Sequence, residues 1–196
     1  MRVISGAYKG KILRSVRDPR IRPATDRVKE SIFNILQNRI NLRGARVLDL
    51  FAGTGSLGFE ALSRGAAKVI FVDEWRGAVK AIEENASLLH CEDRCYVVKA
   101  DVYKFLSRAE GHYNLVFVDP PYKLAHAVDL PRRIFEQGLV APAGLLVMEH
   151  PVRTNIQPNE CFQLLLNRTF GNTRVSFFSH PIQKPVLHPT NSYEQK

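Results

Sequence analysis

Two short segments of this 196-residue chain carry the residue types best suited to chemistry. The segment 47–58 is an apolar run that ends in Gly53, Gly55 and Gly58, and the segment 119–122 reads Asp-Pro-Pro-Tyr. Glycine has no Cβ, so it lets the backbone approach a ligand closely. An aspartate and the carbonyl groups of two prolines are hydrogen-bond acceptors that can hold an amine. Together the two segments predict a nucleotide-type cofactor beside a flat, amine-bearing base, and hence methyl transfer to a nucleobase amine.

The glycine segment indicates which cofactor is bound. Gly53, Gly55 and Gly58 match the pattern G-x-G-x-x-G, and Asp73 follows at the end of the next expected strand, where it can accept hydrogen bonds from ribose hydroxyls. Asp49 stands just before the loop. A carboxylate there would repel a pyrophosphate but attract the ammonium and sulfonium groups of S-adenosylmethionine. The sign of the charge favours S-adenosylmethionine, and the alternative is that Asp49 only binds loop amides.

Further cofactor candidates lie at the ends of the next strands. Asp101 ends the third expected strand, where it can accept a hydrogen bond from the adenine amine, cap the helix that starts at Val102, or do both. Glu74 follows Asp73 directly and is also a cofactor-binding candidate. Its neighbour Trp75 either flanks the adenine or is a partly exposed aromatic residue at a helix start.

The segment Asp119-Pro120-Pro121-Tyr122 is the predicted catalytic site. An exocyclic amine is a poor nucleophile because its lone pair is delocalised into the ring. If Asp119 and the Pro120 carbonyl accept its two protons, the lone pair is directed toward the methyl group, and Tyr122 can stack on the base. Both proline carbonyls are expected to be free. The alternative is a tight turn built of ordinary turn residues.

The positive charge is concentrated in the first quarter of the chain. Residues 1–46 hold 12 Lys or Arg and three Asp or Glu, whereas residues 47–196 hold 16 of each. A basic segment on a neutral body indicates contact with a polyanion, and nucleic acid is favoured over a basic surface that only aids solubility.

The remaining reactive side chains predict no metal site and no disulfide. The three cysteines provide no disulfide framework, which predicts a reducing, cytoplasmic location. Cys91, Cys95 and His90 are one ligand short of a zinc site, so no metal is expected. His150 stands at a strand end and is more simply a surface histidine than part of the pocket. No apolar run is long enough to span a bilayer, and no membrane partner is expected.

From residue 46 onward the sequence alternates between strand and helix patterns. Expected strands cover 46–51, 68–73, 95–100, 114–119 and 144–149, with helices at 56–64, 76–89, 102–108 and 126–138 between them; 161–168 and 173–179 form a hairpin. The strands are apolar throughout, which is typical of a parallel sheet covered on both faces. The predicted fold class is therefore α/β, a Rossmann-like, doubly wound, mostly parallel sheet of about seven strands with a C-terminal antiparallel hairpin.

Three regions are predicted along the chain. Residues 1–45 form a small basic hairpin, over residues 1–16, and a helix that starts at Thr25 or Asp26, both packed on the core. Residues 46–180 form the S-adenosylmethionine-dependent methyltransferase domain. Residues 181–196 form a flexible tail.

The chain resembles class I S-adenosylmethionine-dependent methyltransferases. More narrowly, it is similar to the bacterial RsmD-like family, which methylates guanine N2 in 16S rRNA of the small ribosomal subunit. The resemblance covers nearly the whole chain and rests on residues 22–33, 49–58, 60–66, 85, 119–122 and 170–173. The Arg-Pro-x-Thr-Asp-Arg pattern at 22–27 is the most family-specific, whereas Asp-Pro-Pro-Tyr also occurs in adenine-N6 methyltransferases of DNA and RNA.

The resemblance implies a role for each motif. Residues expected to hold the cofactor are Asp49, Gly53 and Gly55 at the methionine end, Asp73 at the ribose, Asp101 and Val102 at the adenine, and Arg22, Thr25 and Asp26 closing over it. Asp119 to Tyr122 would bind the target base, and the basic segment would contact rRNA phosphates. Phe51 replaces the first glycine of the general class I loop, as is usual in members that methylate amines. Phe51 and Asp119 are also cofactor-binding candidates.

The predicted function is transfer of the methyl group of S-adenosylmethionine to the N2 amine of a guanine in 16S rRNA. The expected partner is that rRNA within the small ribosomal subunit or a late assembly particle, and the protein is expected to act as a monomer. One alternative is an adenine-N6 methyltransferase acting on DNA or RNA. A Rossmann oxidoreductase with a phosphate-bearing cofactor is disfavoured by Asp49, and a non-catalytic RNA-binding protein is disfavoured by the intact segment 119–122.

Overall fold

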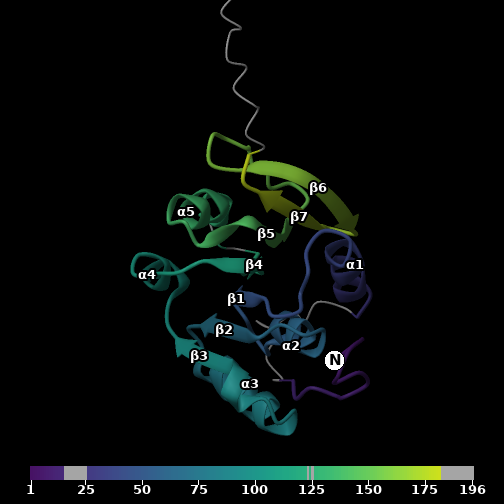
Figure 1. Ribbon diagram of the computed structural model, residues 1–196. Coiled ribbons are helices and arrows are strands. Elements are labelled where there is room, and N and C mark those ends of the chain that lie inside the picture. The colour runs from purple at the N-terminus through teal and green to yellow at the C-terminus, as the bar shows by residue number, and fades with distance from the viewer. Residues whose placement is uncertain (16–25, 123, 125, 182–196) are drawn as a thin grey trace, which may run out of the picture.

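The computed structural model describes residues 1–15, 26–122, 124 and 126–181. Within these residues seven strands form one sheet in the order β3-β2-β1-β4-β5-β7-β6 (Figure 1). The strands are β1 (Arg46–Leu50), β2 (Lys68–Asp73), β3 (Cys95–Lys99), β4 (Tyr113–Val118), β5 (Val140–Pro151), β6 (Gln163–Phe170) and β7 (Thr173–Ser179). Neighbours from β3 to β5 are parallel, whereas β7 is antiparallel to β5 and to β6. The predicted fold class is confirmed.

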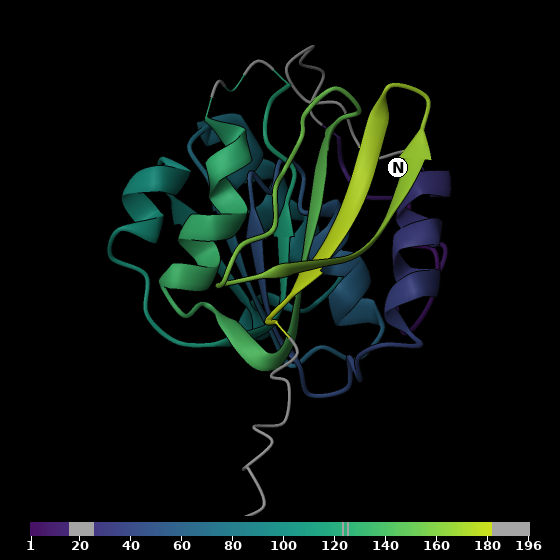
Figure 2. The same ribbon diagram turned by 90° about the horizontal axis from the view of Figure 1, so that it is seen from above.

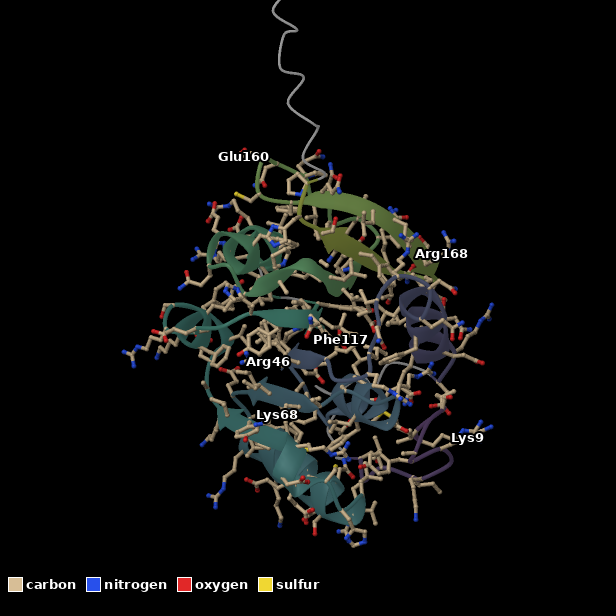
Figure 3. All side chains as sticks on the ribbon, in the orientation of Figure 1. Lys9, Arg46, Lys68, Phe117, Glu160 and Arg168 are labelled. Carbon is tan, nitrogen blue, oxygen red and sulfur yellow. The ribbon has the colours of Figure 1, made fainter. Side chains whose placement is uncertain are left out.

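Helices cover both faces of the sheet. They are α1 (Asp26–Leu36), α2 (Ser56–Ser63), α3 (Arg76–Leu88), α4 (Val102–Leu106) and α5 (Leu130–Glu136), with short 3-10 turns η1 (Glu92–Arg94) and η2 (Ala127–Asp129). Figure 1 shows α4 and α5 on one side of the sheet and α1 and α2 on the other. Because side chains alternate along a strand, Phe117 packs with α1 to α3, and Val116 packs with α4 and α5. Figure 3 shows Phe117 in the interior, where its ring lies 5.8 Å from that of Phe33.

Two predicted elements have different bounds in the structure. The helix expected at 126–138 is divided into η2 and the shorter α5, whose second residue is Pro131. Proline is favoured in the first turn of a helix, because an N–H at that position would have no intrahelical acceptor. Pro131 therefore favours the start of a separate helix, α5, at this point. The strand expected at 144–149 is longer, because β5 pairs with β7 as well as with β4.

The N-terminal segment forms the predicted hairpin and also binds to α2. Among the described residues, an antiparallel bridge joins Arg2 to Ile12, and backbone hydrogen bonds of 2.9 and 3.0 Å join residues 1–3 to 11–13 on either side of it. The carboxylate of Glu60, which is fully buried, accepts hydrogen bonds from the N–H groups of Ile4 and Ser5 at 2.7 and 3.0 Å. These bonds attach the hairpin to α2. The division of the chain into three regions stays a prediction, and the tail beyond residue 181 lies outside the described residues.

The strand order reverses between β1 and β4, which is the topological switch point of the sheet. In such sheets ligands bind at the carboxyl ends of the parallel strands, next to this point. Figure 2 shows that the loop after β4 and the turn between β6 and β7 lie at the same end of the sheet, and that β7 ends at the opposite end. The glycine loop after β1 and the segment after β4 therefore meet at one edge. No helix within the described ranges is long and apolar enough to cross a membrane.

Candidate active site at the switch point

The loop between β1 and α2 has an unusual backbone. Phe51, Gly53 and Gly55 all have positive φ angles, of 56°, 56° and 78°. Gly55 must be glycine, because a Cβ there would lie 2.6 Å from the ring of Phe59. Phe51 occupies the left-handed region of backbone conformation, which residues with a Cβ rarely adopt and which glycine adopts without strain. The buried side chain of Asn85 supports the loop by donating a hydrogen bond to the Thr54 carbonyl at 3.1 Å.

Asp49 lies beneath this loop and is almost completely buried, with 2% of its surface exposed. Its Oδ2 accepts a hydrogen bond from the Gly58 N–H in the first turn of α2 at 3.0 Å, so the amide contact that the alternative interpretation of Asp49 names is present. Burial raises the pKa of Asp49 to about 8; the Gly58 bond opposes this shift and repulsion from Asp73 adds to it. A cationic ligand would relieve the cost of ionising this carboxyl, whereas a phosphate would increase it. The residues at this position therefore fit a ligand that carries an ammonium or sulfonium group.

Asp73 organises the loop from the end of β2. Its two carboxylate oxygens accept hydrogen bonds from the N–H groups of Gly53 at 2.8 Å and Trp75 at 2.9 Å. Burial raises its pKa, and the two amide bonds oppose that shift. Each oxygen keeps a second lone pair, so the role at a ribose remains a prediction compatible with this geometry. Glu74 is exposed to solvent at the same strand end.

The end of β3 shows a helix cap. The side chain of Asp101 accepts a hydrogen bond from the Lys104 N–H at 2.9 Å and caps α4, as one of the two predicted roles requires. Val102 is only 2% exposed and packs in the core, so it can meet a ligand through its backbone but not through its side chain. The contact of Asp101 with an adenine amine stays a prediction.

The segment after β4 presents acceptors at the same edge. Asp119 is half-buried, and its N–H donates to the Leu50 carbonyl at 3.4 Å, which ties the start of the segment to the end of β1. The expectation that both proline carbonyls are free is wrong for Pro121, which accepts from the Leu124 N–H at 2.9 Å and closes a turn. The Pro120 carbonyl has no donor within the part of the chain that the structure describes. Pro120 is thus the one available proline acceptor.

Tyr122 forms a wall of the site. Its ring is 41% exposed, and its hydroxyl is hydrogen-bonded to the Oγ1 of Thr173, the first residue of β7. This bond fixes the phenol against the C-terminal hairpin and leaves a ring face for a ligand. An aromatic ring held in this way is suited to stacking on a base. The contact with Thr173 was not predicted from the sequence.

A third carboxyl joins the site from β5. Glu149 is 7% exposed, and its Oε1 has no hydrogen-bond partner in the part of the chain that the structure describes. Burial raises its pKa to about 7. The pKa of Asp119 is raised well above its usual range by burial, then by repulsion from Glu149 and from Asp49. Sequence analysis missed Glu149 as a site residue, although an acid at the end of the apolar run 145–148 is a signal that could have found it.

The predicted covering segment is described only in part. Arg22 and Thr25 lie outside the described residues. Asp26, the first residue of α1, forms an ion pair with Arg2 at 3.2 Å between two exposed side chains. The contact of these residues with a cofactor remains a prediction.

Lys29 of α1, a few residues after the predicted covering segment in the sequence, is fully buried. It belongs to the basic segment that was expected to meet a polyanion. Its Nζ donates to the Arg2 carbonyl at 2.5 Å and to the Ser56 Oγ at 3.2 Å, and lies 3.9 Å from Glu60. Burial lowers its pKa, and the attraction of Glu60 opposes that shift. Lys29 is therefore a structural support below the glycine loop.

The weaker sequence signals lie away from the carboxyl cluster. His150 is 2% exposed, so the expectation of a surface histidine is wrong; its Nε2 is hydrogen-bonded to the Ser176 Oγ at 2.8 Å on the opposite sheet face. Cys91 and Cys95 are free thiols whose sulfur atoms lie 3.7 Å apart. Within the described ranges, no group of three or more His, Cys, Asp or Glu residues is placed to hold a metal ion.

Comparison with known proteins places this geometry in context. Residues 1–179 match the family described as Conserved hypothetical protein 95. The chain is 38% identical over 183 residues to YlbH of Bacillus subtilis, covering 91% of this chain and 98% of that protein. It is 33% identical over 174 residues to ribosomal RNA small subunit methyltransferase D of Haemophilus influenzae, covering 87% and 89%. The solved structure of yhhF from Escherichia coli superposes with a TM-score of 0.80 at 30% identity, covering 92% and 97%.

Proposed function

We propose, from the premise that the chain belongs to the Conserved hypothetical protein 95 family, the RsmD-like family that its motifs resemble, that it methylates small-subunit rRNA. In full, the proposed reaction transfers the methyl group of S-adenosylmethionine to the N2 amine of a guanine in 16S rRNA. The observation that carries the proposal is the meeting of a buried Asp49, below a glycine loop, with the Asp119 segment at the switch point of the sheet. The first attracts a cation, and the second accepts hydrogen bonds from an amine.

The residues around the glycine loop would hold S-adenosylmethionine. Asp49 would face its cationic methionine end, Asp73 its ribose, and Asp101 with the Val102 backbone its adenine. When bound, this cofactor supplies an electrophilic methyl group on a sulfonium. The buried Asp49 carboxyl also argues for this choice over a phosphate-bearing dinucleotide, because ionised Asp49 would repel a pyrophosphate in a poorly hydrated site.

The residues after β4 would prepare the amine. Asp119 and the Pro120 carbonyl would accept hydrogen bonds from the two N–H groups of the amine and so direct the nitrogen lone pair outward. Tyr122 would stack on the base. Transfer of the methyl group would require the nitrogen to lose one proton, and Asp119 would be the protein group that accepts it. Most of the rate enhancement would then come from alignment of the amine with the methyl group.

The proposed substrate is 16S rRNA in the small ribosomal subunit or a late assembly particle, with the protein acting as a monomer in the cytoplasm. The support is the name carried by the Haemophilus influenzae relative and the positive charge of residues 1–46. A flat base is presented to the pocket most easily when it is unstacked from its neighbours.

The test is methyl transfer followed by product analysis. Small subunits from cells that lack this protein are incubated with the purified protein and S-adenosylmethionine labelled in its methyl group, and the rRNA is digested for mass analysis of nucleosides. N2-methylguanosine at a single position is the expected product. Free 16S rRNA serves as the parallel substrate that distinguishes recognition of the assembled particle from recognition of RNA alone.

Other outcomes would redirect the proposal. N6-methyladenosine would assign the alternative activity, with the same fold and cofactor. Absence of transfer to any subunit or RNA, with S-adenosylhomocysteine shown to bind by calorimetry, would overturn the proposed substrate and favour a binding protein. Failure to bind that product, together with binding of a nicotinamide dinucleotide, would overturn the proposed cofactor.

A further inference from the structure

The Glu149 carboxyl is buried without a partner among the described residues. Glu149 is 7% exposed, and its Oε1 has no hydrogen-bond partner within those residues. The backbone of Glu149 pairs with Val175 in the sheet, so it is the side chain that lacks a structural role there. Leaving a buried carboxyl unpaired costs free energy, so such a group calls for a function or a ligand.

The sheet places Glu149 beside Asp119. The parallel register of β4 and β5 pairs Val118 with Met148, so the next residues on each strand, Asp119 and Glu149, stand side by side at the strand ends. Both belong to the sheet face that Phe117 shares, which is the face of Asp49. Their repulsion contributes to the raised pKa of Asp119. The two carboxyls therefore form one acceptor group at the predicted base site.

Within the described ranges, neither carboxyl of this pair forms an ion pair with a cation. Arg174 of β7 is paired with His150, one residue beyond Glu149, and alternation along the strands places both on the opposite face of the sheet. Directly opposite Glu149 on β7 is Val175, an apolar residue. The carboxyl pair is thus open to donors that a ligand brings.

Two adjacent acceptors match one purine edge and not the other. On its Watson–Crick edge, guanine presents the N1–H beside the N2 amine, so two donors stand next to each other. Adenine presents its N6 amine beside N1, which is an acceptor and would face a carboxylate lone pair. A site that binds a substrate N–H in this way rejects analogues that lack it, because its own buried polar group is then left unpaired.

We propose that Glu149 accepts the N1–H of the target guanine while Asp119 accepts from its N2 amine, so that the pair selects guanine over adenine. This assignment rests on the proposed function, and it adds Glu149 to the residues that contact the base. The Asp-Pro-Pro-Tyr segment also occurs in adenine-N6 methyltransferases, so it does not by itself select guanine. In this assignment Glu149, on another strand, decides which base is methylated.

The experiment removes the N1–H of the target base. Once the methylated position is mapped, small subunits are reconstituted with rRNA ligated to carry either guanosine or 2-aminopurine ribonucleoside there. Both bases have the exocyclic amine, but 2-aminopurine has an N1 lone pair instead of an N1–H and also lacks the O6 carbonyl, so a variant at Glu149 is needed to assign the preference to N1. Single-turnover methyl transfer is measured at pH 8.5, above the pKa of about 7 that burial gives Glu149. The unmodified protein should prefer guanosine by on the order of 100-fold or more.

The variant Glu149→Gln tests the residue itself. Its amide can donate to the N1 of 2-aminopurine, so the preference for guanosine should fall at least about tenfold, while the affinity for S-adenosylhomocysteine stays unchanged and the unfolding temperature does not fall. The matched control is Glu136→Gln, an exposed residue that pairs with Arg132 on α5, and it should keep the full preference.

The outcomes separate the two levels of the proposal. Equal rates of the unmodified protein on both bases would overturn the role of Glu149, and this result needs no variant. An unchanged preference in Glu149→Gln would also overturn it, as would a loss of activity that follows a loss of folded protein. Absence of methyl transfer to guanosine-containing subunits would instead overturn the proposed function from which the inference starts.

Discussion

At the scale of single residues, the site is defined by carboxyls whose burial is costly in the absence of a ligand. Asp49, Asp119 and Glu149 share one face of the sheet, and burial raises the pKa of each. A group whose pKa is raised in the folded state stabilises the fold below its unfolded pKa, and this contribution is lost as the pH rises through the folded pKa. Stability and ligand affinity should therefore depend on pH in opposite senses.

The variant Asp49→Asn tests this linkage. The folded pKa of about 8 lies above the ordinary value of 3.8, so the cofactor-free protein should lose stability between pH 4 and 8. The asparagine variant lacks this contribution and should unfold several degrees higher than the unmodified protein at pH 8.5, while binding S-adenosylmethionine at least about tenfold more weakly. Thermal unfolding from pH 5 to 9 and calorimetry make the comparison. A variant that is less stable at pH 8.5 would contradict the assignment.

The variant Asp119→Ala tests the assignment to the base. Methyl transfer should fall by about 100-fold or more, because the amine loses its acceptor, whereas the affinity for S-adenosylhomocysteine should change less than about twofold. In the unmodified protein the transfer rate should rise with pH as the raised pKa of Asp119 is passed. The exposed residue Asp93 offers the control Asp93→Ala. An equal loss of transfer and of cofactor affinity would show that Asp119 serves the cofactor instead.

At the scale of elements, one side chain joins the N-terminal segment, α3 and the glycine loop. Asn85 of α3 accepts from the Arg14 N–H at 2.7 Å and donates to the carbonyls of Arg14 at 3.2 Å and Thr54 at 3.1 Å. It is fully buried, so its partners have no water to replace it. The loop geometry therefore depends on the packing of the first 15 residues as well as on the glycines.

The variant Asn85→Ala should destabilise the protein by about 2–4 kcal/mol, since it leaves buried polar groups unpaired, and should weaken cofactor binding by loosening the loop. The matched control is Glu84→Gln on the same helix, which removes an exposed ion pair with Arg14 at 3.3 Å and should cost less than about 1 kcal/mol. Denaturant unfolding measures both. Similar losses in the two variants would show that Asn85 is not a structural link.

At the scale of the whole molecule, part of the positive charge that the sequence concentrates in residues 1–46 is used within the protein. In the basic segment Lys29 is buried, and Arg2 and Arg14 form ion pairs. Among the described residues, exposed arginines toward the carboxyl ends of the strands include Arg27 at the start of α1, Arg153 after β5 and Arg168 of β6. Arg168 is paired with Val175, which lies opposite Glu149, so it extends the site across the hairpin (Figure 3).

Replacing these three arginines by alanine should weaken binding to small subunits and reduce its salt dependence. Each phosphate contact that is lost should lower the slope of log affinity against log salt by about 1. The control is Lys68→Ala. Lys68 is exposed at the first residue of β2, so it lies at the amino ends of the parallel strands, whereas the site lies at their carboxyl ends (Figure 3). Binding is measured by filter retention at several salt concentrations. An unchanged slope would place the rRNA on another surface.

The sequence by itself determined the fold class and the two principal motifs, because both are written in local patterns. Apolar runs bounded by loops place the strands, and the segments predicted at 68–73 and 173–179 coincide with β2 and β7. The glycine spacing fixes the loop, and the acids at strand ends, Asp49, Asp73 and Asp119, follow from where apolar runs stop. A parallel sheet then brings these ends to one edge.

Only the tertiary structure decided which partners those residues have. The position of Glu149 beside Asp119, the bond between Tyr122 and Thr173, and the burial of Lys29 all join segments that are distant in the sequence. Local periodicity specifies which face of an element is buried but not which element lies next to it. Strand order and register settle that choice, because they follow from packing of the whole core, and they therefore decide which carboxyls and which cations meet at the site.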